Sequence, residues 1–344
     1  MTWAPLLLAD PSPCLRLLVL RELLGRPKED EEIQELAELQ KEDPLYMDLS
    51  RLQEVDGCWS ARAVYGSSPG GGIKPTAQAL MRLGYLGFGS GDPVVSRGAD
   101  FLFSLQEEDG SWPMESYGMD DETGEGYSMI PLQTSIPLKA LALCGYSEDP
   151  RAENAYEWLM RQRLPDGAWP TGISSGNYGR VAGYRRIAHS LWGCRSNTTG
   201  ALSCLALHPK RRNDPEPRRA LDLLLGRETR ERHALGFEVA RKIGAETARG
   251  FLTYYARYDS AQVLDLCWRV GATREDKRVE DLVGFVLGEQ GQYGLWEYTA
   301  RPQISRWVTF DVLRSLSRLD DEGDWFSLEP RTPFRAYHKR TERF

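Results

Sequence analysis

The chain has 344 residues, a formal net charge of −7 at neutral pH and 41% hydrophobic residues. This composition is ordinary for a globular protein, and the negative balance argues against a protein that coats nucleic acid. No apolar run reaches the length of a membrane-spanning helix. Arginine is over-represented, with 35 arginines against eight lysines, and its planar guanidinium suits carboxylates and phosphates.

The ends and the cysteines indicate a cytoplasmic protein. The first residues lack the basic segment and the long apolar stretch of a secretory signal peptide. The six cysteines are scattered, and no Cys-x-x-Cys pair occurs. We therefore expect reduced, mostly buried thiols.

A repeated Gln-x-x-Asp-Gly-x-Trp motif organises the chain. It occurs at Gln53–Trp59 and Gln106–Trp112, in a longer form at Gln162–Trp169 and in a degenerate form at Gln290–Trp296. The period is about 50 to 60 residues, which is typical of a helix pair with its loops. The last step is about twice as long, so one copy has lost its motif near Leu223–Arg227.

Each repeat has the same order of predicted elements. An apolar segment headed by Thr or Ser comes first, such as Thr134–Leu143, and suits a buried helix. Asp149 and Pro150 then suit the N-cap and first position of an amphipathic helix over Arg151–Gln162. With Cys14–Leu24 as the first, we count six buried helices. Nothing alternates as a strand would, so we predict an all-α fold.

At these repeats the sequence resembles the superfamily of squalene cyclases and protein prenyltransferase β-subunits. The resemblance implies an (α/α)6 toroid, with six inner and about six outer helices around a central cavity. It also implies that the Gln–Trp turns are structural, tying helix ends together. We expect one toroid over residues 14–325, preceded by a segment at 1–13 and followed by an Arg- and aromatic-rich tail at 326–344.

The catalytic motifs of these families are incomplete in this chain. Triterpene cyclases use Asp-x-Asp-Asp, and the nearest sequences here are Met119–Glu122 and Leu319–Glu322. Prenyltransferases bind zinc through an Asp and a Cys two residues apart and a distant His. Asp56 and Cys58 match the first half, but no predicted inner helix begins with His. We therefore favour a structural Cys58 and predict no metal ligands.

The loops before the inner helices are the expected place for a site, because helix N-termini favour anions. These loops span residues 60–75, 113–133, 170–197, 227–259 and 297–308. The predicted catalytic residues are Asp120, Asp121, His189 and Asp311. The predicted ligand-binding residues are Tyr127, Arg185, Arg186, Trp192, Arg195, Asn197, Arg306 and Trp307.

Two alternatives accompany these assignments. The carboxylates of Asp120 and Asp121 suit an acid or a Mg²⁺ site, with Mg²⁺ the one cofactor left open, and a solvated acidic loop is the alternative. The basic loop with His189 suits an anion clamp with a proton-transferring group. Its alternative is a structural cross-link to acidic neighbours.

The charge distribution also favours an anionic ligand. Residues 171–258 hold 16 basic and seven acidic residues in a chain that is acidic overall. The first hypothesis is a terpenoid cyclase- or prenyltransferase-like protein that binds an anionic, partly hydrophobic ligand, such as a prenyl diphosphate, in the central cavity. The alternatives are a lyase or hydrolase of a small anion and a non-catalytic binding module. No nucleic acid partner is expected, and peripheral membrane contact is left open.

Overall fold

The computed structural model of the chain describes residues 3–60, 72–112, 130–173, 178–179, 181, 185–226, 234–246, 258–291 and 293–319. The predicted site residues Asp120, Asp121 and Tyr127 and the tail at 326–344 lie outside these ranges. No helix in the described part is both long and apolar enough to cross a bilayer.

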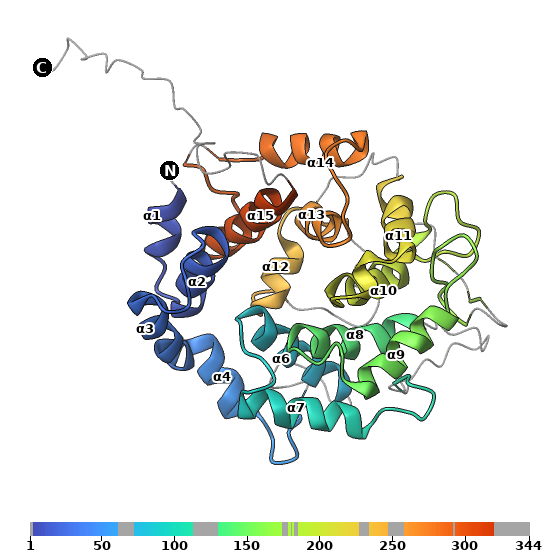
Figure 1. Cartoon of the computed structure of the whole chain (residues 1–344), viewed down its shortest axis with the longest axis horizontal. Helices are drawn as coiled ribbons and strands as arrows, with labels where there is room; N and C mark the ends of the chain where they lie inside the picture. Colours follow the sequence, from blue (N-terminus) through green and yellow to red (C-terminus); the bar gives the residue numbers. More distant parts are fainter. Residues whose placement is uncertain are drawn as a thin grey trace, which may run out of the picture.

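Six helical segments form an inner ring (Figure 1). They are α2 (Pro13–Leu18) continued by η1 (Val19–Leu23), α6 (Ile73–Tyr85), α8 (Ile130–Leu143), α10 (Arg195–Leu207), α13 (Ser260–Arg269) and α15 (Ser305–Leu319). From α6 onwards each packs against the next in chain order, and α15 packs against η1. The ring therefore follows the order of the sequence.

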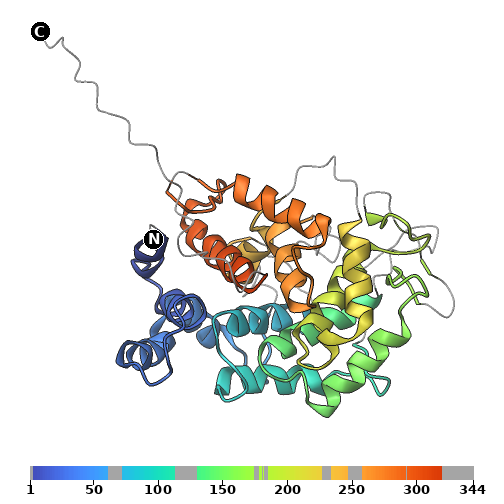
Figure 2. The ribbon, with the colours of Figure 1, turned by 45° about the horizontal axis from the view of Figure 1, so that its top comes forward.

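An outer layer covers this ring (Figures 1 and 2). It consists of α3 (Glu31–Leu39), α4 (Pro44–Leu52), α7 (Pro93–Ser104), α9 (Pro150–Arg161), α11 (Pro215–Leu225) and α14 (Lys277–Gly288), with short 3-10 turns η2 (Gln40–Glu42), η4 (Arg211–Asn213) and η6 (Pro302–Ile304). The described residues contain only two isolated β-bridges and no strand. The predicted all-α toroid is confirmed.

Helix α1 (Trp3–Leu8) belongs to the packed structure. It packs against α2 and α15, and the side chains of Trp3 and Leu7 are buried in the main core. The segment expected to precede the toroid thus contains a six-residue helix that packs on the ring.

Aspartate caps start α7 and α9 at their Asp-Pro pairs, whereas Asp214 before α11 makes no side-chain cap hydrogen bond. The carboxylate of Asp92 accepts hydrogen bonds from the backbone N–H groups of Val94 and Val95, at 2.9 and 3.3 Å. Asp149 caps α9 through the N–H of Arg151 at 2.9 Å. These bonds satisfy N–H groups that have no partner inside the helix.

The Gln–Trp turns join neighbouring repeats through a repeated set of hydrogen bonds. The backbone N–H of Trp59 donates to Thr76 Oγ1 at 3.0 Å, and its indole N–H donates to the carbonyl of Leu49 at 2.8 Å. Trp112, Trp169 and Trp296 make the same two bonds, to Thr134 and Leu102, Thr198 and Leu159, and Thr309 and Val286. The predicted structural role of these turns is confirmed.

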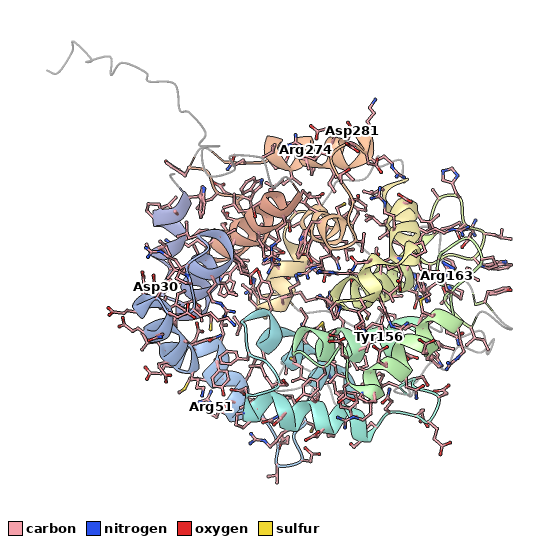
Figure 3. All side chains as sticks on the ribbon, viewed as in Figure 1. Asp30, Arg51, Tyr156, Arg163, Arg274 and Asp281 are labelled. Atoms are coloured by element: carbon pink, nitrogen blue, oxygen red, sulfur yellow. The ribbon has the colours of Figure 1, made fainter. Side chains whose placement is uncertain are left out.

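Charged side chains lie at the periphery of the molecule, whereas buried polar side chains make hydrogen bonds between helices (Figure 3). Asp30, Arg51 and Asp281 lie at the periphery of the molecule, and ion pairs there add little stability. Tyr156 points inward from α9, and its hydroxyl donates to the carbonyl of Cys204 on α10 at 3.2 Å. That bond, shielded from water, ties an outer helix to the inner ring.

A further helix, α12 (Phe237–Lys242), lies inside the ring (Figures 1 and 2). It packs against α6, α13 and α15, and Glu238, Arg241 and Lys242 are buried there. It follows α11, where the Gln–Trp motif is missing. The sequence predicts residues 227–259 as one of the loops before the inner helices, so a helix at the centre of the ring is an unpredicted feature.

Asp259 fixes the position of α12. Its carboxylate accepts hydrogen bonds from the backbone N–H groups of Gly236 and Glu238 at 3.1 and 2.6 Å, and from Ala261 at 3.0 Å. Burial raises the pKa of Asp259 to about 6. One carboxylate therefore caps α13 and also holds the start of α12.

Candidate functional site

A cavity of about 440 Å³ lies where the C-terminal halves of the inner helices meet. Its wall includes residues from η1, α2, α6, α8, α10, α13 and α15, and from α12. The basic side chains in this wall are Arg21, Lys139, Lys242, Arg269, Arg314 and Arg318, and the acidic ones are Glu22 and Asp265. We call this space the ring cavity. Its positive excess suits an anion.

Arg314 is the centre of the ion pairs beside the ring cavity. Its guanidinium bonds to Asp311 and lies 3.6 Å from Asp265 Oδ1 and 3.8 Å from Glu22 Oε2. Burial alone would lower the pKa of Arg314, but these carboxylates raise it above its ordinary value. Arg314 is therefore a fixed positive charge.

Asp265 carries a fixed negative charge in the same wall. Burial alone would raise its pKa, but Arg269, Arg314 and Lys242 hold the pKa well below its ordinary value. The closest of these contacts joins Arg269 Nε to Asp265 Oδ2 at 2.9 Å. Three cations thus share this carboxylate, which leaves the surrounding wall with net positive charge.

Asp311, a predicted catalytic residue, lies in this network and is 1% exposed. Its Oδ2 is 3.8 Å from Lys242 Nζ, and its Oδ1 accepts a hydrogen bond from the Tyr85 hydroxyl at 3.3 Å. Lys242 Nζ also lies 4.9 Å from the centre of the Tyr85 ring. The geometry gives Asp311 a structural role at the end of α12, and a catalytic role stays a prediction.

Lys139 is a functional candidate that the sequence analysis missed. It lines the ring cavity from α8 and is 5% exposed. Burial lowers its pKa to about 8. The surrounding sequence predicts an apolar buried helix. A single lysine within that apolar run is the one signal in the sequence that marks Lys139 as a candidate.

A second pocket, of about 720 Å³, contains two of the predicted ligand-binding residues, Arg306 and Trp307. We call it the Trp307 pocket; it is lined by Asp10, Pro11, Leu45, Ile243, Gly244, Ala245, Leu295 and residues 302–307. Arg306 Nη1 donates to Asp10 Oδ2 at 3.2 Å, and the ring centres of Trp307 and Tyr85 are 5.9 Å apart. Lys242 lines the ring cavity and Ile243 the Trp307 pocket, so the end of α12 borders both spaces.

Three predicted ligand-binding residues, one before α10 and two in its first turn, are buried away from the two pockets. Asn197 Oδ1 accepts a hydrogen bond from the backbone N–H of Leu132 at 2.7 Å, which ties α10 to α8. Arg185 is fully buried, with Nη1 4.0 Å from the Sγ of Cys194, and Arg195 is 4% exposed. None of the three is among the residues that line the ring cavity or the Trp307 pocket.

The other predicted residues of this loop lie on the surface. Arg186 and His189 are exposed, and His189 adopts a left-handed backbone conformation with φ of 64° on a turn. Trp192 is 43% exposed and stacks on Tyr178 with ring centres 5.4 Å apart. The structure therefore divides this set between the surface and the interior, and a ligand-binding role for it stays a prediction.

The part of the chain that the structure describes holds no group of three or more His, Cys, Asp or Glu side chains that could bind a metal ion. The carboxylate of Asp56 accepts a hydrogen bond from the backbone N–H of Cys58 at 3.1 Å, as Asp109 does from Ser111 at 2.9 Å. Burial raises the pKa of the Cys58 thiol to about 11. This pair stabilises a turn.

Residues 29–181, which contain the three clear Gln–Trp turns, match the family model of the squalene-hopene cyclase C-terminal domain. The resemblance to the squalene cyclase superfamily is confirmed. This chain is 29% identical to a squalene–hopene cyclase of Bradyrhizobium diazoefficiens over 152 residues. The match covers 42% of this chain and 22% of that protein. A lanosterol synthase of Candida albicans is 29% identical over 114 residues, 33% of this chain and 15% of that protein.

The matched segments thus span less than a quarter of the length of these relatives. Among solved structures, this chain is similar to the type II terpene cyclase MstE from Scytonema, with a TM-score of 0.46 and 13% identity. The match covers 89% of this chain and 87% of MstE. A protein from Actinoplanes has a TM-score of 0.45, 16% identity and coverage of 89% and 90%.

Proposed function

We propose that this squalene cyclase-like chain binds a small molecule that joins an anionic group to a hydrophobic body, such as a prenyl diphosphate. The anionic group would occupy the ring cavity. The observation that carries the proposal is the excess of six basic over two acidic side chains in the cavity wall. Guanidinium groups suit phosphate and carboxylate oxygens because they offer paired donors in a planar fork.

The hydrophobic body of the ligand would occupy the Trp307 pocket. Its volume falls within the range of about 300–1,000 Å³ that is usual for small-molecule sites. Ile243, Leu295, Ile304 and Trp307 supply apolar surface there. The relatives are named for squalene and lanosterol, which are isoprenoid compounds, and this favours a prenyl body.

Binding can be tested with ligands that differ only in charge. We expect geranylgeranyl diphosphate to bind more tightly than geranylgeraniol by at least about tenfold in calorimetry, because the alcohol lacks the charged group. Inorganic diphosphate should compete with it. Equal affinity for the alcohol and the diphosphate would contradict the proposal.

Two arginines allow the site to be probed with little risk to the fold. Arg21 is exposed and the Arg318 side chain is 37% exposed, although both line the ring cavity. The double variant Arg21→Gln and Arg318→Gln should weaken diphosphate binding by about tenfold, since each removed contact is charge-assisted. Arg51→Gln, on the outer surface, is the matched control and should bind as the unaltered chain does.

A second candidate function, a binding module without catalysis, is favoured by the lack of an Asp-x-Asp-Asp motif in the sequence. Product analysis after incubation with prenyl diphosphates separates the two. Cyclised or transferred products that disappear in the double variant Asp120→Ala and Asp121→Ala would support an enzyme. Binding with no product would support the module.

A further inference from the structure

Lys139 is the one ionisable side chain of α8, a helix otherwise made of apolar and neutral residues. It is 5% exposed and lines the ring cavity. Buried ionisable groups in the wall of a cleft are candidates for a functional role.

Charged and titratable groups surround this amine on three neighbouring helices. Arg241 on α12 disfavours its protonated form, and Glu238 on α12, Cys204 on α10 and Asp265 on α13 favour it. Burial outweighs them all and brings the pKa of Lys139 to about 8. A substantial fraction of the amine is therefore neutral near pH 8, and the neutral amine is the nucleophilic form.

Lys242 offers a contrast within the same cavity. Its Nζ lies 3.8 Å from Asp311 Oδ2 and 4.9 Å from the centre of the Tyr85 ring. A carboxylate and the face of an aromatic ring both stabilise an ammonium ion. The two lysines of the ring cavity thus have different environments, because Lys242 contacts a carboxylate and an aromatic ring.

We propose that Lys139 is a nucleophilic lysine that forms an imine with an aldehyde or ketone whose phosphate or carboxylate is held by the arginines of the ring cavity. The anionic half of this proposal rests on the proposed function. The nucleophilic half rests on the placement of Lys139.

The reaction needs no oxidant or reductant. The lone pair of the neutral Nζ adds to the carbonyl carbon, and the carbonyl oxygen takes one amine proton to give a carbinolamine. That hydroxyl then leaves with the second amine proton as water, and the nitrogen lone pair forms the C=N bond. The arginines keep the anionic group of the substrate in place.

Pyridoxal 5′-phosphate, an aldehyde with a phosphate group, is a suitable probe for the full chain. With cyanoborohydride present, each imine becomes a stable adduct that peptide mass spectrometry can assign among only eight lysines. We expect Lys139 to be labelled at least about tenfold faster than the exposed Lys41, Lys210 and Lys277 at pH 7.5, with a midpoint near pH 8. Preferential labelling of the exposed lysines would overturn the proposal.

Two variants and one competitor complete the test. Lys139→Met should abolish the fast labelling, and the control variant Lys277→Met, at an exposed lysine of α14, should keep it. Inorganic diphosphate should slow labelling of Lys139. Equally fast labelling by pyridoxal, which lacks the phosphate, would overturn the anionic half alone. Diphosphate-sensitive binding of the probe with no adduct at Lys139 would overturn the nucleophilic half and leave the proposed function standing.

Discussion

The ammonium group of Lys242 lies 3.8 Å from the Oδ2 of Asp311, and this contact joins the helix at the centre of the ring to the last inner helix. Both side chains are nearly inaccessible to water. In a low-dielectric interior each charge depends on its partner. The centre of this toroid is therefore ionic and ordered by paired charges in the part that the structure describes.

Loss of the Asp311 carboxylate should destabilise the fold. Asp311→Asn removes the carboxylate that bonds Arg314 and contacts Lys242, and breaking such buried pairs costs about 3–5 kcal/mol. Urea unfolding followed by circular dichroism would measure the loss. Asp281→Asn, on the exposed face of α14, is the control with little expected change. Similar stabilities for the two variants would show that the buried pairs contribute little.

Stability should depend on the ionisation of Asp265 at acid pH. Burial alone would raise its pKa, but Arg269, Arg314 and Lys242 hold it well below the unfolded value of about 3.9. The unfolded state therefore binds a proton first, so this stabilisation is complete above the unfolded pKa and declines as pH falls towards the folded pKa. Unfolding free energies between pH 2 and 6 should show the cost of Asp265→Asn shrinking with acidity. Parallel profiles for the two proteins would refute this.

The glycines of the Gln–Trp turns should be irreplaceable. Gly110 has φ of 94°, and a Cβ there would collide with the carbonyl oxygen of Asn154 on α9. Gly110→Ala should lower the free energy of unfolding by about 1–3 kcal/mol. In Gly284→Ala, within α14, the added methyl meets nothing within 4 Å and should raise stability by about 0.5–1 kcal/mol. Thermal unfolding of the two variants measures both changes in stability. A Gly110→Ala protein as stable as the unaltered chain would contradict the predicted loss.

The threonine hydroxyls near the start of the inner helices should stabilise the fold as hydrogen-bond acceptors. Thr198 Oγ1 accepts the backbone N–H of Trp169 at 3.0 Å, and Thr198 is fully buried. Thr198→Val keeps the shape and leaves that N–H without its acceptor, at a cost of about 1–3 kcal/mol. Thr198→Ser keeps the oxygen and should recover most of the loss. Equal stability of the valine and serine variants in urea would rule out a role for the bond.

The repeat architecture could be predicted from the sequence because its determinants are local. A Gln, a Gly with positive φ and a Trp within one turn make bonds whose partners recur at regular spacing. The Asp-Pro pairs likewise mark helix starts by chemistry confined to a few residues. Such short motifs can be recognised in the sequence without knowledge of the packing.

The ring cavity could not be predicted in this way because each helix contributes only a few charged residues to it. Lys139, Arg269 and Arg314 are far apart in sequence, and only packing brings them together. Helix α12 has six residues, too few to show a period, so its place inside the ring was also hidden. The loop assignments based on helix N-termini pointed to the opposite ends of these helices.

The segment that carries α12 leaves the ring and returns to it at one point. The backbone N–H of Ala234 donates to the carbonyl of Tyr258 at 3.1 Å, and that of Ser260 donates to the carbonyl of Ala234 at 2.9 Å. Ala234 therefore lies beside Ser260, and α12 reaches the centre of the toroid from this single place in the ring. The buried charges of the interior thus come from one short helix as well as from the six repeats around it.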